Sequence, residues 1–133
     1  MREIKFRGLT ERGFVFGYLV VCSTNEGMRY GIKDTPYHVN DGCVNLIPSL
    51  IDEGTDGQYT GLKDKNGIEI YEGDLLADDA GEVFSIIYET YFAGYYLKHE
   101  ITGECVDCYM DELQECFKVI GNIHQHPELI KGE

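Results

Sequence analysis

The chain has 133 residues, enough for one ordinary domain or two small ones to bury a core without disulfides or metals. Its 11 basic and 24 acidic side chains give a formal net charge of −13, which argues against direct binding to nucleic acid because phosphate backbones need several Lys or Arg contacts. Without an apolar run of roughly 18 residues or a basic-then-apolar amino terminus, we expect a soluble cytoplasmic protein with no membrane contact.

The first elements are predicted to be a meander of hairpins. Residues 3–8 alternate polar and apolar side chains, which is typical of a half-buried strand. Residues 14–22 are rich in aromatic and β-branched side chains, so we expect a strand that is buried on most of both faces. Residues 28–33 return as a shorter strand after a loop of turn-forming residues.

Breakers interrupt the pattern over residues 34–57. Short strands at 37–39 and 43–47 are predicted to pair across an Asn-Asp-Gly turn. The acidic, glycine-rich run at 52–57 is the expected boundary between two subdomains, and its spacing does not match a calcium-binding loop.

The stretch 59–76 carries a hairpin followed by a corner. Asp64, Lys65, Asn66 and Gly67 form a tight-turn signature, in which Asp64 is expected to accept a hydrogen bond from the backbone two residues further on. Apolar residues flank this turn on both sides, so it is predicted to join two strands.

This stretch closely resembles the central signature of the YopX family of phage and prophage proteins. The matching segments are residues 2–7, 59–67, 69–74, 119–123 and 127–129. They lie in the family's order and span nearly the whole chain. The resemblance implies a β-rich fold and a phage or prophage origin, and it brings no catalytic residue with it. The family's usual tryptophan near the first segment is absent, since Gly8 and Leu9 occupy that region.

The rest of the chain is predicted to form short strands with one helical turn. In order, these are strands at 75–76, 82–89, 91–99, 105–110 and 117–123, with the helical turn at 111–115 and a short terminal helix from Pro127. That layout is the one found in SH3-like small barrels. We therefore predict a mostly β protein, in which an amino-terminal meander sheet (1–58) packs against a central hairpin plus SH3-like barrel (59–133).

Cysteine and histidine spacing supplies the metal-like patterns. Cys105 and Cys108 are three residues apart, and Cys116, His124 and His126 follow as further candidate ligands. Residues three apart on a strand point to opposite faces, so the first pair would need a turn to share a metal. His124 and His126 share a face only if the last strand extends that far. We predict no metal and no cofactor, and free thiols for the five cysteines.

No catalytic constellation is predicted either. Glu69, Glu72 and Asp74 have no companion base or phosphate loop, and Asp74 is expected to hydrogen-bond backbone at its corner. His38 and His99 have no neighbouring nucleophile or paired acid in the sequence. We therefore expect a protein without enzymatic activity.

Four tyrosines are the predicted contact residues: Tyr88, Tyr91, Tyr95 and Tyr96. Aromatic side chains on a small barrel suit binding of a protein partner because they bury a large area and keep a polar tip. The competing interpretation is that they fill the core. We expect a non-enzymatic protein-interaction module that binds another protein or forms a homo-oligomer.

Two alternatives remain open. Residues 59–133 carry five basic and sixteen acidic side chains, whereas residues 1–58 carry six and eight. An acidic surface of that kind could imitate nucleic acid and inhibit a host DNA-binding protein. The second alternative is a small metal-dependent enzyme.

Overall fold

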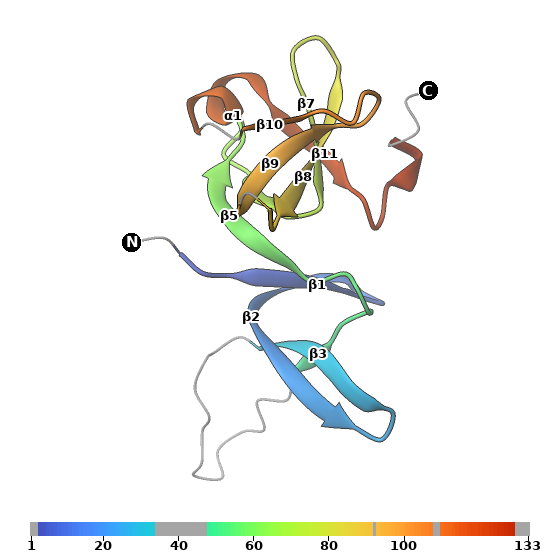
Figure 1. The fold of residues 1–133 in the computed structure, drawn as a ribbon. Coiled ribbons are helices and arrows are strands. Elements are labelled where there is room, and N and C mark those ends of the chain that lie inside the picture. The colour runs from blue at the N-terminus through green and yellow to red at the C-terminus, as the bar shows by residue number, and fades with distance from the viewer. Residues whose placement is uncertain (1–2, 34–47, 92, 108–109, 130–133) are drawn as a thin grey trace. The chain divides into compact units, whose positions relative to one another are not determined.

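The structure is a computed structural model, and it describes residues 3–33, 48–91, 93–107 and 110–129. The described part is mostly β, which confirms the predicted class, with a single short α-helix and one turn of 3-10 helix (Figure 1). Neither of these helices is long and apolar enough to cross a membrane. The chain divides into two compact units, unit 1 (Met1–Gln58) and unit 2 (Tyr59–Glu133). The strands predicted at 37–39 and 43–47 lie outside the described residues.

Unit 1 is one antiparallel sheet. Its strands are β1 (Phe6–Thr10), β2 (Gly13–Thr24), β3 (Gly27–Lys33), β4 (Ser49–Leu50) and the first two residues of β5 (Gly57–Lys63). Their order across the sheet is β4-β3-β2-β1-β5. β2 is the long central strand and pairs with β1 through its first half and with β3 through its second half.

The chain after β4 (residues 51–56), which we call the crossing segment, runs from β3 to β1. The backbone N–H of Ile51 donates to Tyr30 O on β3 at 3.2 Å, and the N–H of Asp52 donates to Leu9 O on β1 at 2.8 Å. β3 and β1 both pair with β2, so two successive residues, Ile51 and Asp52, connect the two strands that neighbour β2. The Ile51 side chain fills the space above Gly8, where a Cβ atom would lie only 2.4 Å from it. Gly8 therefore makes the crossing sterically possible.

We expect Gly8→Ala to lower the free energy of unfolding by about 1 to 3 kcal/mol, since the added methyl group overpacks the Ile51 site. Ile51 is 2 % exposed and has little room to move. Urea denaturation of Gly8→Ala, Ile51→Ala and the double variant measures the effect. The two losses should sum to more than the loss in the double variant, and strict additivity would show that the contact does not constrain the fold.

Unit 2 contains the rest of β5 and six further strands. These are β6 (Glu69–Tyr71), β7 (Asp74–Ala77), β8 (Val83–Glu89), β9 (Gly94–His99), β10 (Cys105–Asp107) and β11 (Lys118–Asn122). β5 pairs with β6, and the other five form an antiparallel sheet in the order β10-β9-β8-β7-β11. Closure of a barrel requires its two terminal strands to pair. β10 and β11 end this sheet, and within the described residues they do not pair. The sheet is therefore open where a barrel is predicted, and SH3-like packing is not confirmed.

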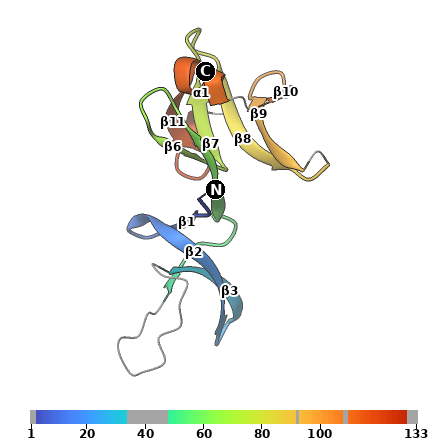
Figure 2. The same ribbon diagram turned by 90° about the vertical axis from the view of Figure 1, so that its left-hand side faces the viewer.

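The second strand of the β8–β9 hairpin, β9, is shorter than predicted. The strand expected from residue 91 begins at Gly94, because the chain turns between Thr90 and Ala93. Ala93 has a positive φ of 53°, which suits a turn and not a strand. Figure 2 shows this hairpin extending away from the rest of unit 2. Only Val83, Phe84 and Ser85 of β8 pair with β7, so the hairpin tip lies beyond that strand.

The core of unit 2 lies between the five-stranded sheet and the helix α1 (Met110–Cys116). Its buried members are Ile70, Leu76, Phe84, Ile86, Leu97, Leu113 and Phe117. The sequence placed a helical turn at this position, and the structure confirms it. Leu113 is fully buried and Cys116 packs beside it against the core, so among the described side chains Leu113 is the main anchor of α1. The predicted terminal helix is one 3-10 turn, η1 (Pro127–Leu129).

Candidate interaction surfaces

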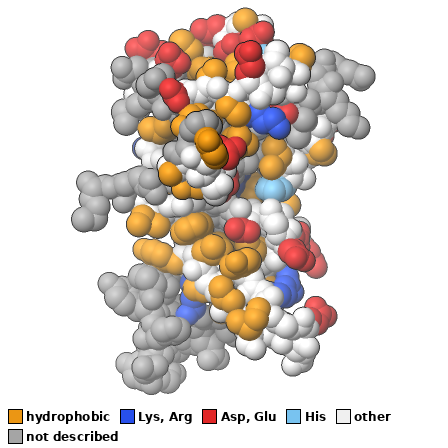
Figure 3. Space-filling model, viewed as in Figure 1, with side chains coloured by type: hydrophobic (Ala, Val, Ile, Leu, Met, Phe, Trp, Pro, Cys, Tyr) orange, Lys and Arg blue, Asp and Glu red, His pale blue; other side chains and the backbone are white. Residues whose placement is uncertain are grey.

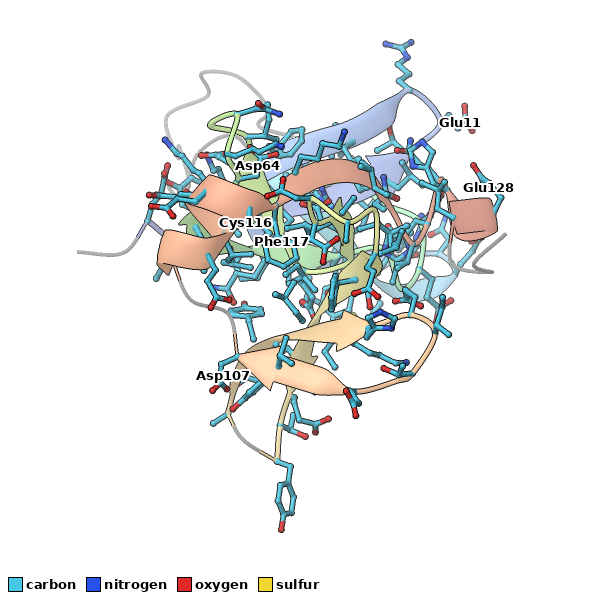
Figure 4. All side chains as sticks on the ribbon, turned by 90° about the horizontal axis from the view of Figure 1, so that it is seen from above. Glu11, Asp64, Asp107, Cys116, Phe117 and Glu128 are labelled. Atoms are coloured by element: carbon cyan, nitrogen blue, oxygen red, sulfur yellow. The ribbon has the colours of Figure 1, made fainter. Side chains whose placement is uncertain are left out.

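The polar residues of the central hairpin are used to build the fold. Asp64 lies in the β5–β6 turn (Figure 4) and is 3 % exposed. Its Oδ1 accepts hydrogen bonds from the N–H groups of Asn66 and Ile68 at 2.8 and 2.9 Å, and its Oδ2 accepts one from Val119 N–H at 2.8 Å. The carboxylate therefore shapes the turn and joins it to β11. The bond to Asn66 is the one that the turn signature predicts.

The other acidic candidates also have structural partners. Asp74 is 2 % exposed, and its Oδ2 accepts the Tyr71 N–H at 2.7 Å, which confirms the predicted corner bond. The phenolic oxygen of Tyr71 lies 3.4 Å from Glu69 Oε1. The positions of Asp74 and Glu69 are therefore explained by contacts within the fold.

The two candidate metal-binding histidines lie beyond the last strand. β11 ends at Asn122, so His124 and His126 are not neighbours on a strand face. His126 Nδ1 accepts the Asn122 N–H at 3.2 Å, and the Asn122 side chain in turn accepts the N–H groups of His124 and Gln125. Asn122 thus organises this turn.

The remaining candidate ligands are only partly placed. Cys105 is exposed on β10 and Cys116 is half-buried at the end of α1, while Cys108 and His38 lie outside the described residues. His99 is hydrogen-bonded in the β9–β10 turn, where its Nδ1 accepts the N–H groups of Ile101 and Thr102. Within the described ranges, no three His, Cys, Asp or Glu residues gather to hold a metal ion.

The structure separates the four predicted tyrosines. Tyr88 on β8 and Tyr95 on β9 face each other with ring centroids 5.2 Å apart and an interplanar angle of 74°, an edge-to-face pair. Tyr91 lies in the hairpin turn and is 87 % exposed. Tyr96 is on the opposite face of β9 from Tyr95 because side chains alternate along a strand. Tyr88, Tyr91 and Tyr95 therefore lie at one hairpin tip, and Tyr96 does not join Tyr88 and Tyr95.

A second surface, in unit 1, was not predicted. On the face of the sheet that carries Ile51, Val21 of β2 lies opposite Tyr30 of β3, and Met28 lies two pairs further along, opposite Ser23. These three side chains, which we call the β2–β3 patch, are 58 %, 47 % and 67 % exposed, respectively. The crossing segment covers Gly8 but not this end of the sheet.

The opposite face of the same sheet is also apolar and open. Phe16, Tyr18 and Leu50 are all exposed there, and Figure 3 shows hydrophobic side chains gathered over the strands of unit 1. The prediction that the strand at 14–22 is buried on most of both faces is therefore wrong. Every residue of β2 is half-buried or exposed.

Burial differs sharply between the two units. Among the described residues, unit 1 buries two hydrophobic side chains, Ile32 and Ile51, whereas unit 2 buries eleven. Independent stability of a small sheet requires an apolar face that is covered. Several large apolar side chains in the described part of unit 1 thus remain exposed.

Comparisons with known proteins give a family and a fold. The family model described as YopX protein matches residues 24–131. Among solved structures, the chain is similar to the crystal structure of protein EF1440 from Enterococcus faecalis, with a TM-score of 0.56 and 23 % sequence identity over 98 % of this chain and 99 % of that chain. At that identity the likeness shows the fold alone. No curated protein matches the chain.

Proposed function

This chain belongs to the YopX family, and from that premise we propose that it is a non-enzymatic accessory protein that acts by binding another protein. The supporting observation is the uneven burial of the two units. Unit 1 leaves Val21, Met28 and Tyr30 exposed together on one face of a sheet with few buried side chains. Exposed apolar groups that gather in this way are typical of interaction sites.

The chemistry of the β2–β3 patch suits protein contact. Tyr30 offers a large rigid ring with a polar tip, and tyrosine and methionine are enriched at the centres of interfaces. Met28 is unbranched and can adapt to the shape of a partner. Burial of apolar surface contributes about 25 cal/mol per Å². A partner that covers these exposed side chains would therefore stabilise the sheet of unit 1.

The tyrosine tip of unit 2 is a second contact surface in this proposal. Tyr95 is half-buried and packs against the core, and Tyr88 packs on it, so these two side chains already contribute to folding. Tyr91 is the one most available to a partner. We include in the same proposal a phage or prophage origin, a cytoplasmic location, and an open SH3-like arrangement of β7 to β11 with α1 before its last strand.

We expect Met28→Asp to abolish capture of the partner by tagged protein from a lysate of the source organism, measured by mass spectrometry. A buried carboxylate without a partner costs several kcal/mol, which is a loss of more than about a hundredfold in affinity. Ile101→Asp is the matched control. Ile101 is 75 % exposed in unit 2, and this substitution also introduces one negative charge. Equal capture by wild type and Met28→Asp would refute the proposal.

A second candidate function rests on the charge of unit 2. Glu82, Glu104, Asp107, Glu112 and Glu115 are all exposed there, and Figure 3 shows acidic side chains gathered over the end of unit 2 that is uppermost in the view. A surface of this kind could occupy a DNA-binding protein. Addition of duplex DNA during the capture experiment tests this function. Release of the captured protein by DNA and by moderate salt would favour mimicry, and capture that resists both would exclude it.

A further inference from the structure

A groove lies beside the β2–β3 patch, where the crossing segment departs from β3. It has a volume of about 510 Å³. Its apolar lining comes from Met28, Tyr30 and Ile51. Ligand-binding clefts commonly have volumes of about 300 to 1,000 Å³, so this groove has room for one or two side chains of a partner. Unit 1 supplies all of these described lining residues.

The rim of the groove is acidic. Glu26 comes from the β2–β3 turn, while Asp52 and Glu53 come from the start of the crossing segment, and all three side chains are exposed. Two separate parts of the chain therefore place three carboxylates around an apolar floor. This combination favours a ligand that brings positive charge and an apolar group together.

Among the described residues of the lining, Arg29 is the one basic residue, and it has a structural contact. Its guanidinium Nη2 donates a hydrogen bond to Ile51 O at 3.1 Å. That bond fixes the start of the crossing segment beside β3, next to the bond between Ile51 N–H and Tyr30 O. Arg29 thus positions the Asp52 and Glu53 side of the rim and leaves the lining with an excess of negative charge.

The acidic rim favours a basic partner over a second copy of this chain as the occupant of the groove. A second copy of this chain carries the same net charge of −13 and would bring the same acidic rim to a symmetric contact. Like charges brought face to face at an interface cost several kcal/mol. A basic partner instead gains from both the local rim and the long-range field of the whole protein.

We propose that the groove binds a basic segment of a protein partner, with an apolar side chain seated on Met28 and Tyr30 and Lys or Arg side chains facing Glu26, Asp52 and Glu53. This inference rests on the proposed interaction function and adds the chemical class of the partner.

The test is fluorescence polarisation with the full chain and a labelled ten-residue peptide that alternates Lys with Leu and Phe. An otherwise identical peptide with Glu in place of Lys is the ligand control. We expect the basic peptide to bind and the acidic one not to bind. Glu26→Lys/Glu53→Lys should weaken binding by about tenfold or more, and Met28→Ser by a similar factor.

The matched control is Glu112→Lys/Glu115→Lys on α1, which makes the same change in net charge at exposed positions of unit 2. It should change the affinity by less than about twofold. If the two charge variants weaken peptide binding equally, the affinity depends only on the net charge of the protein. That result would overturn the inference. The neutral pair Glu26→Gln/Glu53→Gln repeats the test if the lysine variant does not fold.

Failure of this inference can be told apart from failure of the proposed function. If Met28→Asp abolishes capture from the lysate while Glu26→Lys/Glu53→Lys leaves capture unchanged, the β2–β3 patch is an interface and the basic-partner inference is wrong. If both variants abolish capture while the α1 control does not, the inference is supported. A captured partner that proves to be another copy of this chain also overturns it.

Discussion

Asp64→Ala is expected to lower the free energy of unfolding of unit 2 by about 3 to 5 kcal/mol. The substitution removes a carboxylate that is 3 % exposed and that accepts hydrogen bonds from three backbone N–H groups. A buried donor without an acceptor costs about 1 to 3 kcal/mol. One of the three bonds also joins residues 55 positions apart, so its loss frees the hairpin from β11. Urea unfolding followed by circular dichroism measures the effect.

Asp78 offers an unusually close control. Its Oδ1 accepts the N–H groups of Ala80 and Glu82 at 3.0 and 2.9 Å, the same two local bonds that Asp64 makes two and four residues further along its own turn. The bonds of Asp78 are exposed, so water replaces them when the carboxylate is removed. Asp78→Ala should therefore cost only about 1 kcal/mol. Equal losses for the two variants would mean that the buried contact to Val119 does not stabilise the fold.

Leu113→Ala is the second large effect, with an expected loss of about 2 to 5 kcal/mol in the free energy of unfolding. Leu113 is fully buried and belongs to the core cluster that also contains Phe117. Truncation leaves a cavity and removes the anchor of a seven-residue helix, which is too short to be stable by itself. We therefore expect amides of α1 to exchange with solvent much faster in the variant, as measured by hydrogen-exchange mass spectrometry.

Leu50→Ala makes the same chemical change where the side chain is 38 % exposed. It should cost no more than about 1 kcal/mol, because the small apolar area that it loses is already partly in contact with water. Comparable losses at positions 50 and 113 would contradict the assignment of Leu113 to the core. Unchanged exchange in α1 would contradict its role as the anchor.

The local chemistry of the central hairpin was predictable from the sequence. Asp64 to Gly67 is a turn signature that places the hairpin and the bond to Asn66, and Asp74 follows a strand at a position where a short acidic side chain caps backbone. The bond from Val119 to Asp64 was not predictable, because it depends on how β11 is placed in three dimensions. Sequence patterns report on neighbours along the chain and give little information on such long-range contacts.

The alternation of side chains along β8 and β9 predicted which of them share a face. It did not predict which of them are buried. Phe84, Ile86 and Tyr88 do share a face, and Phe84 and Ile86 are buried while Tyr88 is 44 % exposed. β7 pairs with the beginning of β8 only, so the tip of the hairpin is uncovered. Closure of the predicted barrel failed for a similar reason, since strand order along the chain does not determine whether terminal strands pair.

Unit 1 illustrates the same limit for the interaction surface. An apolar, β-branched strand such as β2 is typical of a strand buried on both faces, and the sequence was interpreted in that way. The described structure has only one segment that crosses this sheet, and it covers Gly8 and leaves Val21, Met28 and Tyr30 exposed.

Site-specific photo-crosslinking in the source organism tests the central claim most directly. A photoreactive phenylalanine analogue is introduced at position 28, and for comparison at position 91 in the tyrosine tip and at position 112 on α1. The account predicts a discrete adduct with another protein from position 28 and none from position 112. The absence of an adduct at position 28, together with a clear one at position 91, would contradict the claim that the β2–β3 patch is the principal interface.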